Sequence, residues 1–347
     1  MRALVMRPDS LLVEERPMPE PGPGQVLVKS LVCGICGSDL HLYRHAQHFY
    51  QMGLDSGVPA EVLDRGVILG HEFIGEIAAF GVETKQDLSI GQRVCSTPFL
   101  KGELESIAIG STPLIDGAYA EYFLLSEELL IPVPDDLPSD AAALTEPLAI
   151  GLHAVNKAQL AEDRVAVVVG CGPIGLASIV ALKLRGCNEI IAADYSEKRR
   201  QLAQALGATV VVNPAEADIF SAIPADHQEQ PATVFECTGV NGVLGECIDA
   251  APALSEIIVA GISHGEDSFT PATAIAKQLS IHFVMFYSSD EYADALRVLA
   301  SGSINWQPWI TGKVGLDGIA RAFEDLRDPE LHAKILIYPH GVHDNQP

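Results

Sequence analysis

The stretch VAVVVGCGPIG at residues 165–175 determines the fold of the middle of this chain. Five apolar residues lead directly into a glycine-rich turn, and a helix-like segment follows at 176–185. A GxGxxG pattern alone is a weak signal, but between a strand and a helix it indicates a nucleotide-binding βα unit. Gly170 permits the tight turn, Gly172 lets the backbone approach a pyrophosphate, and Gly175 lets the helix pack closely on the strand. The alternative is a glycine-rich turn that binds nothing.

Further apolar segments follow at the spacing expected of strands. They alternate with helix-like segments, and continuous apolar strands separated by helices are typical of a parallel sheet that is buried on both faces. After the strand at 165–169, the expected strands are 190–193, 210–212, 234–235 and 257–260. We therefore predict an α/β fold with a Rossmann-type, doubly wound parallel sheet over residues 148–288.

The end of the second expected strand carries the residue that selects the cofactor. Asp194 stands about 20 residues past the glycines, where a carboxylate can accept hydrogen bonds from the adenosine ribose. A 2′-phosphate would meet a like charge there, so the sequence favours NAD, and NADP is less expected. Lys198 and Arg199 lie nearby and weaken this inference, unless they are ordinary solvated helix residues. The candidate cofactor contacts, at this turn and at later strand ends, are Gly170, Gly172, Pro173, Ile174, Gly175, Asp194, Arg199, Cys237, Thr238, Gly261 and Ile262.

The stretches on either side of this domain differ from it in composition. Residues 1–147 are rich in glycine, proline and short β-branched runs such as QVLVK at 25–29. This pattern predicts many short strands joined by tight turns, in a barrel-like or sandwich domain. The elements expected in the tail, 289–347, are helices at 290–301 and 316–327 and a closing strand at 333–338.

Composition and charge exclude several functions. With 48% hydrophobic and 20% charged residues, the 347-residue chain is not disordered and is long enough for two domains. Its 46 acidic and 22 basic side chains give a formal charge of −24, which repels nucleic-acid phosphates and anionic lipid, so we expect neither partner. No apolar run reaches the length of about 18 residues that a membrane-spanning helix needs, and the first residues lack the apolar core of a signal peptide. Seven scattered cysteines do not form a disulfide pattern, so we expect a cytoplasmic protein.

A second set of motifs indicates a metal site. CGIC at 33–36 suggests a zinc half-site, but no second CxxC exists to complete a four-cysteine structural site. The segment continues as GICGSDLH over 34–41, and the later motifs are GHE at 70–72, DGAYAEY at 116–122 and EPLA at 146–149. Followed by the GCGPIG turn, this ordered set resembles the zinc-containing medium-chain dehydrogenases, the alcohol dehydrogenase family, over essentially the whole chain.

The resemblance implies a second domain and a zinc site within it. The domain would be a GroES-like β-barrel catalytic domain at 1–147, completed by 289–347. In it, Cys36 would supply a thiolate ligand and His71 an imidazole ligand to one catalytic zinc ion. A catalytic zinc takes three protein ligands and keeps one position open, and sulfur, nitrogen and oxygen donors are all acceptable.

Two glutamates are candidates for the remaining zinc ligand. Glu146 falls where many family members have a second cysteine, and a glutamate there is the pattern of the sorbitol, threonine, glucose and butanediol dehydrogenase branch. In that branch Glu72 or Glu146 completes the ligand set, directly or through water, and the two can exchange. Taken singly, Cys36 could be a small core residue and Glu146 an acidic residue at a helix start.

The resemblance also implies catalytic roles for residues near Cys36. Asp39 would orient His71, because metal-bound imidazoles usually donate their second ring N–H to an acceptor. Ser38 would accept the alcohol proton and pass it through the nicotinamide ribose to His41 and solvent. His41 could instead be a surface histidine. The candidate catalytic residues are Ser38, His41, Glu72 and Glu146.

The chain departs from the family pattern in two places. Many members carry four closely spaced cysteines that bind a structural zinc, whereas this chain offers only Cys95 and no cysteine over 96–115. The structural zinc is therefore expected to be absent. The segment 42–69 is longer than in compact members, and its aromatic and histidine side chains could line the substrate entrance or form a surface or subunit contact. His45 and His48 are not expected to bind zinc without carboxylate or cysteine partners.

Together these features predict a zinc-dependent, NAD-linked oxidoreductase. It would interconvert a secondary alcohol or polyol and its ketone or aldehyde by hydride transfer. Two other functions stay open at this point: a zinc-free quinone or enoyl reductase, and a non-catalytic NAD-binding protein. The expected partners are a small alcohol or carbonyl substrate and, by analogy with the fold alone, further copies of the chain in a homodimer or homotetramer.

Overall fold

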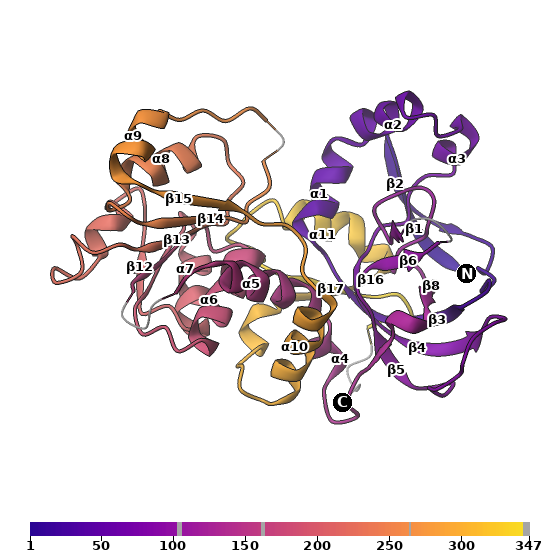
Figure 1. Ribbon diagram of the computed structural model, residues 1–347. Coiled ribbons are helices and arrows are strands. Elements are labelled where there is room, and N and C mark those ends of the chain that lie inside the picture. The colour runs from indigo at the N-terminus through magenta and orange to yellow at the C-terminus, as the bar shows by residue number, and fades with distance from the viewer. Residues whose placement is uncertain (103–105, 161–163, 264, 343–347) are drawn as a thin grey trace. The chain divides into compact units, whose positions relative to one another are not determined.

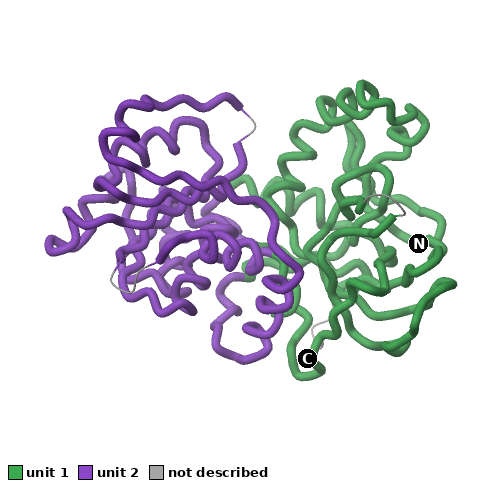
Figure 2. The backbone as a smooth tube through the Cα atoms, in the orientation of Figure 1, with its two compact units in different colours: residues 1–146, 310–328, 334–347 green, residues 147–309, 329–333 purple. Residues whose placement is uncertain are grey.

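The chain folds into two compact units, which Figure 2 shows in different colours. Each unit has its own sheets and its own hydrophobic core, and Figure 1 labels their helices and strands. The computed structural model describes residues 1–102, 106–160, 164–263 and 265–342. The first unit contains residues 1–146, 310–328 and 334–347, and the second contains 147–309 and 329–333.

The second unit is built on a six-stranded sheet in which all neighbouring strands run parallel. The strand order is β12-β11-β10-β13-β14-β15, so the first strand in chain order lies at the centre, as in doubly wound dinucleotide-binding domains. The predicted Rossmann-type sheet is confirmed, and β15 is a strand that the sequence analysis did not predict. The bounds are β10 (Ala166–Val169), β11 (Ile190–Ala193), β12 (Val210–Val212), β13 (Thr233–Glu236), β14 (Glu256–Val259) and β15 (Ser280–Phe283).

Helices pack against this sheet, and α6 determines where the glycine turn lies. It begins at Pro173 directly after Gly172, and proline suits the first helical position because an N–H there would have no helical partner. Its residues 175–182 are all buried, and the helix contacts β10, β11 and β13. The helices from residue 145 to 309 are α5 (Thr145–Lys157), α6 (Pro173–Leu184), α7 (Glu197–Leu206), α8 (Val243–Ala250), α9 (Pro271–Lys277) and α10 (Ser289–Ala300), with 3-10 turns η2 (Ile219–Ala222) and η3 (Gln307–Trp309).

The tail of the chain is shared between the units. The sequence analysis assigned everything after residue 288 to the first domain, whereas residues 289–309 and 329–333 lie in the second unit. Helix α10 shows the reason. Its Glu291 receives a hydrogen bond from Asn156 at 2.8 Å and lies 2.9 Å from Nδ1 of His153, and both partners belong to α5.

In the first unit, β3 is the central strand of the largest sheet. It pairs antiparallel with β4 along its length, with β8 near its start and with β17 at its end. The register pairs Cys33 with Ile337 and Gly34 with Leu336, so Lys334 lies beside the loop that follows β3. The seven-stranded sheet comprises β3 (Gln25–Gly34), β4 (Glu72–Phe80), β5 (Arg93–Cys95), β8 (Tyr122–Ser126), β9 (Ile131–Pro132), β16 (Gly312–Gly315) and β17 (Ile335–Tyr338), and two hairpins pair β1 (Arg2–Arg7) with β2 (Ser10–Glu15) and β6 (Phe99–Lys101) with β7 (Ser106–Ala108).

The segment that the sequence analysis left without an assigned structure, 42–69, is largely helical. Figure 1 shows α2 following α1 with almost no loop between them. Within the described ranges, none of the helices of either unit is both long enough and apolar enough to cross a membrane. The helices of the first unit, apart from the start of α5, are α1 (Gly37–Arg44), α2 (Ala46–Asp55), α3 (Ala60–Asp64), α4 (Ser139–Ala142) and α11 (Ile319–Asp325), with 3-10 turns η1 (Glu127–Leu129) and η4 (Leu316–Gly318).

Candidate active site

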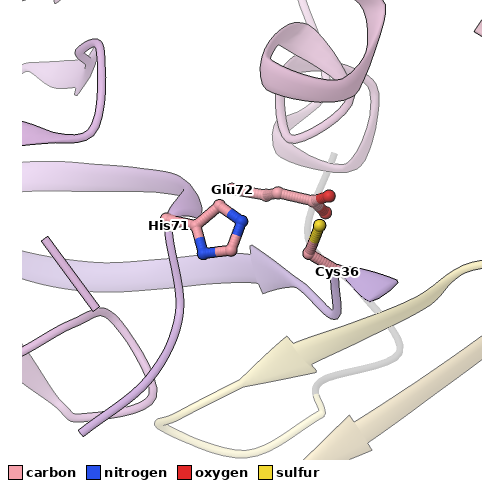
Figure 3. A group of neighbouring side chains, drawn as sticks. All are labelled: Cys36, His71 and Glu72. Atoms are coloured by element: carbon pink, nitrogen blue, oxygen red, sulfur yellow. The ribbon is translucent and has the colours of Figure 1, made fainter. Parts of the chain in front are cut away.

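Three side chains with metal-binding atoms converge in the first unit. Figure 3 shows Cys36, at the start of α1, facing His71 and Glu72, at the start of β4. One donor atom from each lies within 4.8 Å of the other two, and no other group of three or more such residues occurs in the described part of the chain. Glu72 is buried, whereas Cys36 and His71 keep some exposure. The donor set of sulfur, nitrogen and oxygen suits zinc.

Two glycines make room for this convergence. A Cβ on Gly34 would lie 2.0 Å from Oε2 of Glu72, so a side chain there would displace the carboxylate. Gly70 has a φ of 103°, and its Cβ would lie 2.4 Å from the ring of Tyr119. The glycine of the GHE motif is therefore needed both for its backbone conformation and for the close approach of an aromatic ring.

Asp39 lies beside the His71 ring. Its Oδ1 lies 3.5 Å from Nδ1 of His71, while its Oδ2 accepts hydrogen bonds from the Cys36 N–H at 3.0 Å and the Tyr119 hydroxyl at 2.6 Å. Asp39 and Tyr119 are fully buried. With Nδ1 directed at a carboxylate, Nε2 is the ring nitrogen available to a metal, which is the arrangement that zinc-bound histidines require.

The electrostatics of the cluster favour a cation. Burial alone would lower the pKa of His71, but the charges of Asp39, Cys36 and Glu146 outweigh it and raise this pKa well above its ordinary value. Burial raises the pKa of Asp39, despite the neighbouring His71. The negative groups around His71 thus stabilise positive charge at this point, and a divalent ion would supply such charge.

Lys334 is part of this site, although the sequence analysis did not identify it. Its side chain is completely buried, and its Nζ donates to both oxygens of Glu72, at 2.7 and 2.6 Å, and to the Ile35 carbonyl at 3.0 Å. A charged residue within the otherwise apolar segment AKILIY at 333–338 is the only sequence signal that could have indicated it. Glu72 is therefore already paired with a buried cation.

Glu146 lies in the first turn of α5 and is 8% exposed. Its charge contributes to raising the pKa of both His71 and Lys334, so it lies near the cluster. It is not one of the three residues whose donor atoms lie within 4.8 Å of one another. The structure thus brings Cys36, His71 and Glu72 together and places Glu146 close by.

The two residues expected to relay a proton lie on α1. Ser38 is exposed, and its Oγ lies 3.4 Å from Nε2 of His71. His41 lies one helical turn further on, and its ring contacts those of His45 and Phe49. Ser38 is thus next to a candidate zinc ligand, and both Ser38 and His41 keep some exposure to solvent.

Cys95 does not belong to this group of candidate ligands. It ends β5, is fully buried, and points its sulfur at the Ile131 carbonyl 3.8 Å away.

In the second unit, the glycine turn has the geometry expected of a phosphate cradle. Gly170 has a φ of 92°, and a Cβ there would lie 2.6 Å from Thr238. A Cβ on Gly175 would lie 1.9 Å from the Gly170 carbonyl oxygen, so only glycine lets α6 approach β10 this closely. A Cβ on Gly172, at the N-terminus of α6, would meet only the Arg199 guanidinium, at 4.0 Å, which leaves space above the turn.

Asp194 lies directly after β11 and is held by the backbone. Its Oδ2 accepts the Cys171 N–H at 2.9 Å and its Oδ1 accepts the Ser196 N–H at 2.8 Å. Arg199 approaches Oδ2 to 3.9 Å, and its buried Nε has no hydrogen-bond partner among the described residues. A carboxylate oxygen has a second lone pair, so Asp194 can still accept from a ribose hydroxyl.

The later strand ends are organised by Glu236, a buried residue that the sequence analysis missed. Its Oε1 accepts the N–H groups of Thr238 at 2.7 Å and Gly239 at 3.1 Å, and its backbone carbonyl accepts the Gly261 N–H at 2.9 Å. Cys237 is half-buried beneath the glycine turn, and the Ile262 side chain is 60% exposed. Glu236 thus joins the two predicted loops at the carboxyl ends of β13 and β14.

Comparisons with known proteins agree with this geometry. The model of the alcohol dehydrogenase GroES-like domain matches residues 22–135, and that of the zinc-binding dehydrogenase domain matches residues 173–301. The (R,R)-butanediol dehydrogenase of Bacillus subtilis (strain 168) is 33% identical, with 94% of this chain and 96% of that protein covered. The sorbitol dehydrogenase of Bos taurus is 28% identical, with 96% of this chain and 94% of that protein covered.

The solved structures show the same fold. The crystal structure of 2R,3R-butanediol dehydrogenase from Bacillus subtilis matches with a TM-score of 0.83 and 30% identity, and the match covers 97% of this chain and 99% of that one. The likeness extends over both units, and the zinc-free reductase and the non-catalytic protein that the sequence left open receive no support from it. The chain belongs to the zinc-containing medium-chain dehydrogenase family, the alcohol dehydrogenases, and is an oxidoreductase of that family.

Proposed function

We propose that this chain is an NAD-linked dehydrogenase with one catalytic zinc ion, which interconverts a secondary alcohol, diol or polyol and its ketone or aldehyde by hydride transfer. The observation that carries the proposal is that donor atoms of Cys36 and His71 lie within 4.8 Å of each other and of Glu72, with a second carboxylate, Glu146, close by. The substrates named for the relatives, butanediol and sorbitol, support it further, because both carry adjacent hydroxyl groups on secondary carbons.

In this proposal, the resting zinc ligands are Cys36, His71 and Glu146. Glu72 is the residue that can exchange with Glu146 as the third ligand. Glu72 gives both oxygens to the buried ammonium of Lys334. Drawing Glu72 away would leave that ammonium unpaired in the interior, and breaking a buried ion pair costs about 3–5 kcal/mol. Glu146, in the first turn of α5, lies close enough to the cluster to raise the pKa of His71, and it could supply the oxygen ligand while Glu72 keeps its pair with Lys334.

Zinc in this position supplies Lewis acidity that makes the hydroxyl of a neighbouring alcohol easier to ionise. The residues of the chain then handle the proton. Ser38 can accept it, because a hydroxyl both donates and accepts hydrogen bonds. His41, one turn along α1 and half-buried, can pass it to solvent near neutral pH. Asp39 would keep the His71 ring oriented for the metal, and a bound nicotinamide would supply the acceptor for the hydride that leaves the alcohol carbon.

NAD is the proposed cofactor, in preference to NADP. Support comes from Asp194, whose two oxygens are fixed by the N–H groups of Cys171 and Ser196 beside the glycine turn. A 2′-phosphate would approach this fixed negative charge, whereas a 2′-hydroxyl could donate to it. The guanidinium of Arg199 lies 3.9 Å from the same carboxylate, which reduces its attraction for an added phosphate.

A homodimer formed through β15 is the proposed assembly, with a homotetramer as the alternative. β15 is an edge strand that has only β14 beside it within the described part of the chain. Large apolar side chains are exposed on and around it: Phe283 and Ile275 are each 73% exposed, and Met285 is 60% exposed. Two copies of an edge strand can pair antiparallel about a twofold axis, which is self-complementary.

The cytoplasm is the proposed location. All seven cysteines are free thiols, which suits a reducing compartment.

Metal analysis combined with a substrate panel tests the function. We expect about one zinc ion per chain and NADH formation with vicinal diols or polyols. Cys36→Ser should abolish alcohol oxidation while leaving NADH binding, measured by fluorescence, close to that of the wild type. A metal-free preparation that oxidises alcohols, or equal loss of oxidation and NADH binding in the variant, would contradict the proposal.

A further inference from the structure

His41 and His45 lie one helical turn apart on the first unit. The His45 N–H donates to the His41 carbonyl at 3.1 Å, and the Phe49 N–H donates to the His45 carbonyl at 3.1 Å, so α1 continues into α2 through a helical turn. Residues four apart on a helix have side chains on the same face. The two imidazole rings accordingly lie with centroids 4.4 Å apart and planes inclined at 41°.

This separation suits two imidazoles bound at a right angle to one metal ion, whereas a tetrahedral angle would place their centroids about 5.2 Å apart. With a metal–nitrogen bond of about 2.1 Å, an imidazole centroid lies about 3.2 Å from the ion, and two imidazoles at a right angle have centroids about 4.5 Å apart. The observed 4.4 Å matches this value without any change in the backbone. Paired histidines four residues apart on one helix face are an established way to bind zinc.

We propose that His41 and His45 form a second, surface site for a divalent transition-metal ion such as Zn²⁺ or Ni²⁺, with water completing the coordination. Imidazole is a preferred ligand for these ions. His45 is exposed and His41 half-buried, so an ion can enter from solvent. The formal charge of −24 attracts cations to the protein as a whole. The rings of Phe49 and His41 lie edge to face, at a centroid distance of 6.1 Å.

His48 is a built-in control for this site. It lies on the same helix only three residues beyond His45, and it is exposed. Its ring packs against that of Phe49, at a centroid distance of 6.0 Å. The sequence analysis did not expect His45 to bind a metal, because it looked for carboxylate or cysteine partners and did not count His41 as a ligand.

The site would also regulate the enzyme, a consequence that rests on the proposed function. In that function His41 passes the alcohol proton to solvent. A metal ion on His41 occupies a ring nitrogen and prevents that transfer, so binding at this site slows turnover. A chelator too weak to extract the catalytic zinc should restore the rate.

Equilibrium dialysis of the zinc-loaded full chain, made without a histidine tag, tests the site directly. With Ni²⁺ as the probe and both metals measured by mass spectrometry, we expect about one nickel ion per chain with the zinc content unchanged. His45→Asn should bind Ni²⁺ at least about tenfold more weakly, whereas His48→Asn should bind it as the wild type does. Nickel binding by His45→Asn equal to that of the wild type, or nickel appearing only as zinc is lost, would overturn the proposal.

Activity measurements separate the site from the proposed function. Ni²⁺ should slow alcohol oxidation by the wild type and His48→Asn, with at least about a tenfold higher nickel concentration needed for His45→Asn. If no variant oxidises any alcohol, the proposed function fails while the dialysis result still decides the site. If nickel binds at His45 without slowing oxidation, the site stands and the regulatory consequence is overturned.

Discussion

Glu72 and Glu146 are the same type of residue with different surroundings, and their surroundings decide their roles. Glu72 is bound through both oxygens to Lys334, whose side chain is fully buried. Glu146 lies in the first turn of a helix and is also largely buried. Glu72 is therefore a poor candidate for a resting zinc ligand, because moving its carboxylate would leave the ammonium of Lys334 without a counter-charge in an apolar environment.

Exchanging each glutamate for glutamine tests this division of roles. Glu146→Gln should weaken zinc binding roughly 10–100-fold or more, because a ligand oxygen loses its charge. Glu72→Gln should keep its zinc but unfold more easily, because Lys334 loses its counter-charge. Zinc content after dialysis against a graded chelator series measures the first effect, and urea unfolding measures the second. The reverse pattern, with zinc lost from Glu72→Gln alone, would show that Glu72 is the resting ligand.

Lys334→Met removes the positively charged partner of the same ion pair. The zinc-free protein should lose roughly 3–5 kcal/mol of unfolding free energy, because Glu72 is left buried without a partner. The zinc-loaded protein should lose less, since the ion can replace the missing positive charge. Denaturant unfolding with and without zinc measures both values, and Lys85→Met, at an exposed position, is the control. Equal losses with and without zinc would mean that Glu72 does not respond to the metal.

At the scale of elements, the sequence predicted most exactly a strand that is a completely buried run of apolar residues. The strand at 190–193 has all four residues buried, and its predicted bounds are those of β11. β15 was missed because Ser280–Phe283 is a short edge strand that alternates polar and apolar residues and leaves Phe283 exposed. The helices over 42–69 were missed because their apolar residues mix with histidine and glutamine, without a clear buried face.

The start of α10 carries an electrostatic anchor whose effect depends on pH. Burial would raise the pKa of Glu291, but hydrogen bonds from the Ser288 backbone, Asn156 and His153 outweigh it and lower this pKa to about 2. Because the folded-state pKa lies below the unfolded one, Glu291 stabilises the fold at neutral pH. That contribution is lost as the pH falls from the ordinary glutamate range toward 2.

Glu291→Gln should therefore destabilise the second unit by about 1–3 kcal/mol at pH 7. The difference from the wild type should shrink steadily as the pH is lowered below about 4. Urea unfolding at a series of pH values, with the exposed Glu20→Gln as the control, measures it. A difference that stays constant down to pH 3 would mean that the carboxylate charge is not the source of the stabilisation.

At the scale of the whole molecule, the order of motifs along the chain was enough to indicate both the family and most of the candidate site. Lys334 was not predictable, because its contact with Ile35 spans 299 residues of sequence and depends on the register of β17 on β3. Glu236 was missed for a similar reason: it acts through the backbone of two loops that a sequence pattern cannot bring together. Contacts that arise from strand register, not from local spacing, lie beyond single-sequence reasoning.

The exposed edge of β15 allows the assembly to be tested. Phe283→Lys should convert a dimer to monomers in sedimentation velocity, because a charge on the edge strand opposes edge-to-edge pairing. Val210 lies in β12, the strand at the other edge of the same sheet, and is 38% exposed. Val210→Lys should leave the β15 dimer intact. If Phe283→Lys assembles as the wild type does, the β15 interface is excluded.

The pairing of Glu72 with Lys334 also imposes an order on biosynthesis. The two residues are separated by 262 positions, so at 5–20 residues per second the ribosome makes Glu72 roughly 10 to 50 seconds before its lysine partner. During that interval the nascent first unit holds Cys36, His71 and Glu72 without the cation that later neutralises the carboxylate. Glu72 would be open to a metal ion in that interval, and the arrival of β17 would then bring Lys334 to its carboxylate.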